Sequence, residues 1–140
     1  MNLINKTILL MINYFSKYKF IFYSCNFILI VLYLYPGSLL GCYIYNDCKT
    51  QPQITANFIV STNHLYAYIA HSVIGFLTFR KNNQFNNLSI YLIFLSITLE
   101  VLQYFVPNRS FEFSDLCGNI AGVIIAIIIF YFLKNEKFKN

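Results

Sequence analysis

A short stretch in the C-terminal half of the chain carries side chains that can bind polar groups or exchange protons with them. They are Glu100, Gln103, Arg109, Asp115 and Asn119. Carboxylates can act as general acids or bases, and arginine presents a planar fork of donors that suits phosphate or carboxylate groups. On a helix, Glu100, Gln103 and Pro107 share one face, and Asp115 and Asn119 share the face of another. The spacing therefore predicts two polar helix faces that meet across one short loop.

Glu100 lies in an apolar run and needs a partner there. It falls about 18 Å along its helix from Leu88, inside the outer leaflet of a bilayer. An unpaired charge against lipid costs roughly 3 kcal/mol or more, so we expect this carboxylate to face neighbouring helices and to pair, as Asp115 also can, with Arg109. Two interpretations stay open: the network binds a ligand, or it only pins two helices together. Asn119 has the same two interpretations, because amides also hydrogen-bond between membrane helices.

A second stripe of small and polar residues recurs every four positions earlier in the chain, which predicts one helix face turned toward its neighbours. The stripe is Asn63, Ala67, His71 and Gly75. His64 is expected at the outer membrane interface, either solvated or functional, and His71 lies deeper. Gly118 and Gly122 have the spacing that allows close helix contact, so their helix is expected to approach one of the two preceding helices.

The composition indicates a membrane as the environment of these elements. Of the 140 residues, 58% are hydrophobic and only 11% are charged, which is too little polar surface for a soluble globule of this size. A spanning helix needs about 20 apolar residues. Runs at 20–34 (extendable to 40), 58–79, 88–106 and 116–133 predict an all-α integral membrane four-helix bundle. Residues 1–19 are expected to form a cytoplasmic or interfacial segment, and 134–140 a basic cytoplasmic tail.

The basic residues predict the orientation of this bundle. Eight of them flank the spans on one side: Lys6, Lys17, Lys19, Arg80, Lys81, Lys134, Lys137 and Lys139. Only Lys49 and Arg109 lie opposite. Because loops rich in Lys and Arg are retained in the cytoplasm, both termini are predicted to be cytoplasmic. The polar cluster then lies at the extracytoplasmic ends of the last three spans.

Cysteine positions and net charge limit the classes of site. Cys42 and Cys48 fall in an outer loop where a disulfide could form, whereas Cys25 and Cys117 lie in or near spans. A Cys42–Cys48 bridge and four unpaired cysteines both stay open. No metal-type spacing pairs cysteine with histidine, so no metal site and no cofactor are predicted. The net charge of +5 comes from isolated residues and short pairs, so nucleic acid is not an expected partner.

The C-terminal pattern resembles that of VanZ-like membrane proteins. The shared positions are Glu100, Gln103, Pro107, Arg109, Asp115, Asn119 and Gly122. The resemblance continues over the earlier stripe, where Gly75 is kept, while Asn63, His64, Ala67 and His71 stand where the family has Asp, Lys, His and Tyr. A role that needs the family's histidine would fall to His64 or His71. The resemblance implies a four-span domain over 20–133, with its best match at 63–133. The family's namesake is associated with resistance to teicoplanin.

Three functions are compatible with the residues and with this resemblance. The first is binding of a membrane lipid or lipid-linked envelope ligand at the extracytoplasmic face of the bacterial inner membrane, with an effect on glycopeptide susceptibility. The second is a membrane-embedded enzyme acting on a lipid headgroup, with Glu100 or Asp115 as acid or base. The third is a purely structural or assembly role. An ion or proton pathway ranks behind these, because the ionisable groups gather on one side.

Overall fold

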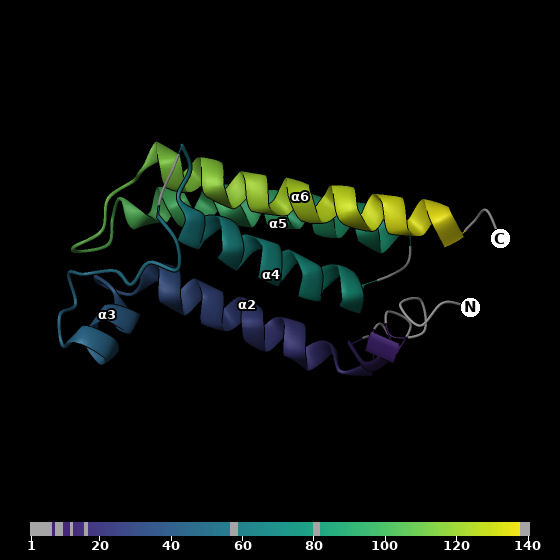
Figure 1. The fold of residues 1–140 in the computed structure, drawn as a ribbon, viewed down its shortest axis with the longest axis horizontal. Helices are drawn as coiled ribbons and strands as arrows, with labels where there is room; N and C mark the ends of the chain where they lie inside the picture. The colour runs from purple at the N-terminus through teal and green to yellow at the C-terminus, as the bar shows by residue number, and fades with distance from the viewer. Residues whose placement is uncertain are drawn as a thin grey trace.

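All the regular secondary structure that can be described in this protein is helical, which confirms the predicted all-α class. The computed structural model describes residues 7, 10–11, 13–15, 17–56, 59–79 and 82–137. The helices are α2 (Lys19–Leu34), α3 (Leu39–Tyr45), α4 (Thr62–Thr78), α5 (Asn82–Gln103) and α6 (Phe113–Lys137) (Figure 1). Much of the predicted N-terminal segment, 1–19, lies outside these residues.

Helices α2, α4, α5 and α6 lie side by side and alternate in direction (Figure 1). Their shared core is apolar and includes Leu92 and Val123, which are completely buried. Large apolar side chains such as Phe27, Ile90 and Phe132 are exposed on the outer faces of α2, α5 and α6. An apolar exterior of this extent is expected of helices that contact lipid.

Among the residues that the structure describes, two helices are long and apolar enough to cross a membrane, over Gln84–Gln103 and Phe113–Leu133. A third span results if α2 and α3, which are bent by 79° at the break between them, count as one. Helix α4 has 17 residues and is shorter than these two. The protein is therefore a membrane protein with two or three candidate spans, while the four-span bundle and the cytoplasmic termini stay predictions.

Several helix boundaries differ from those that hydropathy predicted. Helix α3 lies in a segment expected to be a loop; the Ser38 hydroxyl caps it by accepting from the Gly41 amide at 3.0 Å. Helix α5 ends at Gln103, so Pro107 lies beyond it and does not share its face. Helix α6 begins at Phe113, which puts Asp115 in its first turn. A hydropathy profile places helix ends at the limits of apolar runs. It therefore misses helix ends that contain polar residues, which are favourable at caps and in the first turn.

The segment after α2 turns sharply and is closed by a disulfide. Pro36 follows Tyr35, whose backbone is extended, and a residue before proline disfavours the helical conformation. Cys42 and Cys48 are bonded, which decides the alternative that the sequence left open. The Ser38 amide also donates to the Cys48 carbonyl oxygen at 2.7 Å. In Figure 1 this segment lies at the same end of the molecule as the start of α4 and the loop between α5 and α6.

Helix α6 approaches α4 through two glycines, as the Gly118 and Gly122 spacing predicted. A Cβ atom at Gly118 would lie 2.6 Å from the Ser61 carbonyl oxygen. A Cβ atom at Gly122 would lie 2.6 Å from the Leu65 carbonyl oxygen and 2.9 Å from the Cβ of Tyr68. Real Cβ atoms do not come this near to backbone, so neither position accepts a larger residue without displacing a helix.

The glycine contact predicts that Gly122→Ala lowers the free energy of unfolding by about 1–3 kcal/mol, the usual cost of overpacking a well-packed contact. Gly75→Ala is the matched control, because its Cβ would meet only the side-chain ends of Phe22 and Leu88, at 3.0 and 3.1 Å. Thermal unfolding in detergent measures both variants. Equal midpoints for Gly122→Ala and the unchanged protein would contradict a backbone contact at this position.

The disulfide predicts that a membrane-impermeant maleimide labels Cys42 and Cys48 in intact cells only after treatment with an impermeant reductant. Cys25→Ser and Cys117→Ser remove the other two thiols from the assay. Cys42→Ser should free Cys48 for labelling without reductant. Because the two cysteines lie six residues apart, the bond should contribute about 2 kcal/mol to stability. Labelling of the unreduced pair would contradict the bond, and no labelling after reduction would contradict its outer location.

Candidate functional site

The candidate site is built around His64, near the start of α4. Only 5% of its side chain is exposed, so the expectation of a solvated interfacial histidine is wrong. Its Nε2 atom lies 3.2 Å from Oδ2 of Asp115 in the first turn of α6, and its Nδ1 atom lies 3.9 Å from Oε2 of Glu100 on α5. The tight contact of α6 with α4 accounts for this burial, because it brings the start of α6 against the start of α4.

Asn119 connects His64 to the other two helices and is itself completely buried. Its Oδ1 atom lies 3.1 Å from Nδ1 of His64 and accepts a hydrogen bond of 2.7 Å from the Tyr33 hydroxyl. Its Nδ2 atom donates to Oε2 of Glu100 at 3.3 Å. The amide thus uses its acceptor for His64 and Tyr33 and its donor for Glu100, which gives it a single orientation.

Glu100 is completely buried, as the cost of exposing a charge to lipid required. Its Oε1 atom accepts the backbone amide of Glu112 at 3.1 Å, and its Oε2 atom accepts from Asn119. The side chain of Glu112 is itself exposed, so this residue contributes through its backbone. Charge-assisted hydrogen bonds of this kind stabilise a buried carboxylate.

The predicted pairing of Arg109 with Glu100 or Asp115 is wrong: among the described residues, Arg109 makes no ion pair with either. Instead its Nη2 donates to the Leu32 carbonyl oxygen at 3.1 Å and its Nε to that of Tyr35 at 3.4 Å. Burial lowers the pKa of the Arg109 guanidinium, and the Asp115 carboxylate opposes that change. Arginine stays protonated at neutral pH in any case, so a positive charge faces the negative end of the α2 dipole.

Gln103 has a similar role beside Arg109. It is buried, and its Nε2 donates to the Tyr33 carbonyl oxygen at 3.2 Å. The last carbonyl groups of a helix have no partner within it, and Pro36 prevents α2 from continuing. Side chains from the end of α5 and from the following loop satisfy these carbonyls. The contacts of Gln103 and Arg109 with the end of α2 were not predicted from the sequence.

His71 does not join the site. It is buried further along α4, with its Nε2 atom 3.0 Å from Oδ1 of Asn26, and its ring stacks on Phe22. Asn63, also on the predicted stripe, holds the loop before α4: its Nδ2 donates to the Pro52 carbonyl oxygen at 2.6 Å, and its Oδ1 accepts the Ile54 amide at 3.0 Å.

Tyr33 belongs to the site, although nothing in the sequence singled it out. Its hydroxyl lies 3.1 Å from Nδ1 of His64, and its side chain is 6% exposed. The chain has 12 tyrosines, and Tyr33 is 31 residues from His64 and 86 from Asn119. The one available signal was its place in the last turn of an apolar helix that ends at a proline.

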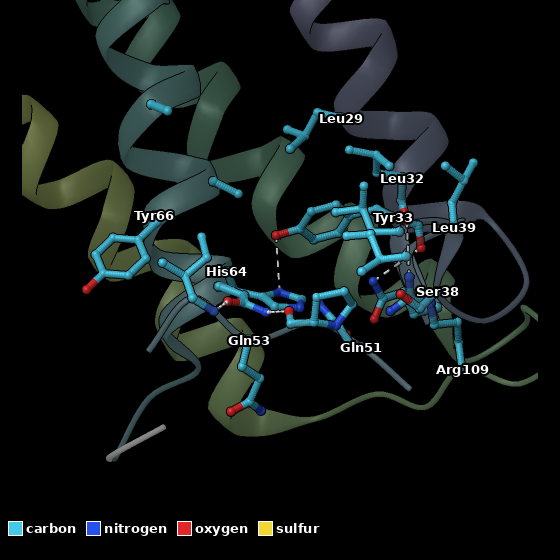
Figure 2. Close-up of a pocket in the computed structure, with 18 residues that line it drawn as sticks. Leu29, Leu32, Tyr33, Ser38, Leu39, Gln51, Gln53, His64, Tyr66 and Arg109 are labelled. Atoms are coloured by element: carbon cyan, nitrogen blue, oxygen red, sulfur yellow. Dashed lines mark hydrogen bonds between the residues drawn. The ribbon is translucent and has the colours of Figure 1, made fainter. Parts of the chain in front are cut away.

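A cleft of about 590 Å³ opens beside His64, between α2, α3, α4 and the segment around Gln51 to Ile54 (Figure 2). Its walls are largely apolar and come from three helices: Leu29 and Leu32 of α2, Leu39, Leu40 and Ile44 of α3, and Ala67 and Ala70 of α4. Figure 2 shows the Tyr33 hydroxyl directed at the His64 ring, with Arg109 across the cleft. Glu100 and Asp115 do not line it, so His64 separates the cleft from the carboxylates.

This arrangement can support two kinds of chemistry. A histidine with a carboxylate on Nε2 can accept or donate a proton at a group in the cleft. His64, Glu100 and Asp115 also offer three ligand atoms that all lie within 4.8 Å of one another, although no metal site was predicted. Short spacings in the sequence do not reveal this set, because the three residues come from three separate helices.

The end of α2 generates a prediction for Arg109. Arg109→Gln removes two hydrogen bonds to carbonyl oxygens that have no partner in their own helix, and it should lower the free energy of unfolding by about 2 kcal/mol. Arg109→Lys keeps the charge at the helix end but loses the fork, so it should recover only part of this loss. Lys49→Gln removes an exposed cation from the neighbouring loop and serves as control. Thermal midpoints that match for Arg109→Gln and Lys49→Gln would contradict the role of Arg109 at α2.

Comparison with known proteins gives a family but no individual relative. The sequence matches the VanZ/LLP1 family over residues 3–134. Searches of curated proteins and of solved structures found no match. The family match covers nearly the whole chain, including the first third, where the sequence resemblance had rested on hydropathy alone. The protein therefore belongs to the VanZ/LLP1 family.

Proposed function

We propose that this VanZ/LLP1 membrane protein binds a membrane lipid or a lipid-linked envelope component at the extracytoplasmic face of the bacterial cell membrane. The observation that carries the proposal is the apolar cleft with His64 and Arg109 on its walls. Its volume of about 590 Å³ falls within the usual range of small-molecule sites, about 300–1,000 Å³. Binding of such a component would also give the protein an influence on glycopeptide susceptibility.

The lining of the cleft favours an amphiphile over a polar solute. Leu29 and Leu32 on one side and Ala67 and Ala70 on the other are well suited to an acyl or isoprenoid chain. Ala70 is exposed and the cleft is not enclosed by protein there, so a chain could enter from the side. The apolar exterior of the neighbouring helices supports entry from lipid.

The polar residues of the cleft favour an anionic headgroup. Arg109 uses Nε and one terminal nitrogen for carbonyl groups, which leaves further guanidinium donors for a phosphate or carboxylate. His64 can add a hydrogen bond to the same group. The positive-inside bias and the Cys42–Cys48 disulfide both support an extracytoplasmic location for this end of the molecule.

A second function, a membrane-embedded enzyme acting on the headgroup, is favoured by the 3.2 Å contact between His64 Nε2 and Asp115. In this function His64 would exchange a proton with substrate through Nδ1, with Asp115 orienting the ring through Nε2, and substrate would take the place of Asn119 and Tyr33 at Nδ1. This differs from the assignment that the sequence favoured, because Glu100 and Asp115 lie behind the histidine. A structural or assembly role is the remaining alternative.

The proposal predicts that Ala70→Trp reduces the amount of co-purifying lipid severalfold, because the indole would fill part of the cleft. Ala70 is exposed, so the protein should still fold. Ile90→Trp, at a 68% exposed position of α5 outside the cleft, is the matched control. Native mass spectrometry measures bound lipid for both variants, and a modified lipid in the spectrum would favour the enzyme. Equal lipid in the two variants would rule out the cleft as the binding site.

A further inference from the structure

The cluster of His64, Glu100 and Asp115 holds more negative charge than the neighbouring side chains balance. Glu100 is completely buried and the Asp115 side chain is 18% exposed. Within the described part of the chain, no lysine or arginine forms an ion pair with either carboxylate, because Arg109 binds the carbonyl groups of α2 instead. Buried charges need a partner or must be neutralised, so the negative charge can be balanced by a proton on one of the three residues or by a bound cation.

The hydrogen bonds of Asn119 leave Nε2 of His64 available for such a cation. Because Nδ2 of Asn119 donates to Glu100, its Oδ1 faces His64 and can only accept. Nδ1 of His64 must therefore carry the proton that it donates to Asn119. Metal-binding histidines usually have this arrangement, in which the second ring nitrogen donates to a neighbouring oxygen and the ring is fixed in orientation.

The distances around Nε2 suit a metal ion. Ligand atoms that bind one zinc ion at about 2.0–2.2 Å lie about 3.3 Å apart when the geometry is tetrahedral. The 3.2 Å between Nε2 of His64 and Oδ2 of Asp115 matches this separation. Ligand atoms from all three residues lie within 4.8 Å of one another, which is about 1.5 Å more than this separation, so the Glu100 side chain must move closer to complete the set.

We propose that His64, Asp115 and Glu100 bind one divalent transition-metal ion, Zn²⁺ or Mn²⁺, at the end of the bundle where α4 and α6 begin. One imidazole and two carboxylates match these ions better than Mg²⁺ or Ca²⁺, which prefer oxygen ligands alone. Three protein ligands leave a coordination position open. The ion would lie on the carboxylate side of the His64 ring, away from the cleft, so water would fill this position, and ion binding does not depend on the proposed function.

The test is metal binding by the full chain in detergent, purified with an affinity tag that contains no histidine. After treatment with EDTA and dialysis, ZnCl₂ or MnCl₂ alone is titrated and bound metal is counted by mass spectrometry. We expect one equivalent of one of these ions per chain, with His64→Gln and Asp115→Asn each weakening binding at least about 100-fold. Asn119→Ala, which removes no ligand but frees the ring, should weaken it about 10- to 100-fold.

Two controls make the result specific. The chain has two histidines, so His71→Gln tests adventitious binding to the other imidazole, and Asp47→Asn tests binding to an exposed carboxylate of the outer loop. Both should bind like the unchanged protein. Should His64→Gln fail to fold, Asn119→Ala and Asp115→Asn carry the same comparison.

The inference is overturned if the unchanged protein binds less than one equivalent of Zn²⁺ and also less than one equivalent of Mn²⁺. It is also overturned if His71→Gln loses as much binding as His64→Gln. Co-purifying lipid is measured on the same samples before and after EDTA. If the protein retains lipid but binds no metal, this inference fails and the proposed function stands. If the protein binds metal but carries no lipid, the proposed function fails and this inference stands.

Discussion

The close contact between α4 and α6 is the constraint on which the rest of the structure depends. At Gly118 and Gly122 the two backbones come so near that no Cβ atom fits between them. Van der Waals packing between small residues is a main source of helix association where lipid surrounds the protein. The same contact fixes how α6 is rotated and how far it is shifted along α4. Asn119, next to Gly118, is therefore directed at His64, and Asp115 reaches the other side of the same ring.

The end of α2 explains why Arg109 does not pair with the carboxylates and why His64 does. Pro36 stops the helix inside the molecule, and its last carbonyl groups then need donors. Arg109 can donate to two of them at once, which a histidine or a lysine cannot do with the same geometry. The carboxylates of Glu100 and Asp115 then have His64 as their neighbour. Histidine is smaller than arginine, fits between the helices and can change its protonation state near neutral pH. The two networks meet at Tyr33, whose carbonyl oxygen accepts from Gln103 while its hydroxyl donates to Asn119.

Periodicity and hydropathy predicted which residues face inward but not which of them touch. Helix spacing predicts that Glu100 and Asn119 are buried and that they contact each other. It also predicts the close helix contact at Gly118 and Gly122. The partner of Arg109 and the depth of His64 do not follow from helix spacing, because they depend on where α2 ends and how far α4 is shifted against α6. Tyr33 was missed since a hydroxyl at the end of an apolar helix has no signature in a chain so rich in tyrosine. The candidate metal ligands were missed for a related reason: three helices supply them.

His64 and Tyr33 belong to both the cleft and the buried network, and the position of His64 decides what the site can do. Among the described residues that line the cleft, His64 and Arg109 are the two that can carry a positive charge. Behind His64, two carboxylates supply negative charge that is shielded from the cleft by the ring itself. An anionic headgroup placed there would be closer to Arg109 and His64 than to the carboxylates, because the His64 ring lies between the cleft and Glu100 and Asp115. A divalent cation held between His64 and Asp115 would offset the two negative charges of Glu100 and Asp115, since a divalent ion is the largest local charge in such a site. A proton or a metal ion at His64 would therefore reduce the repulsion between these carboxylates and an anionic group placed in the cleft.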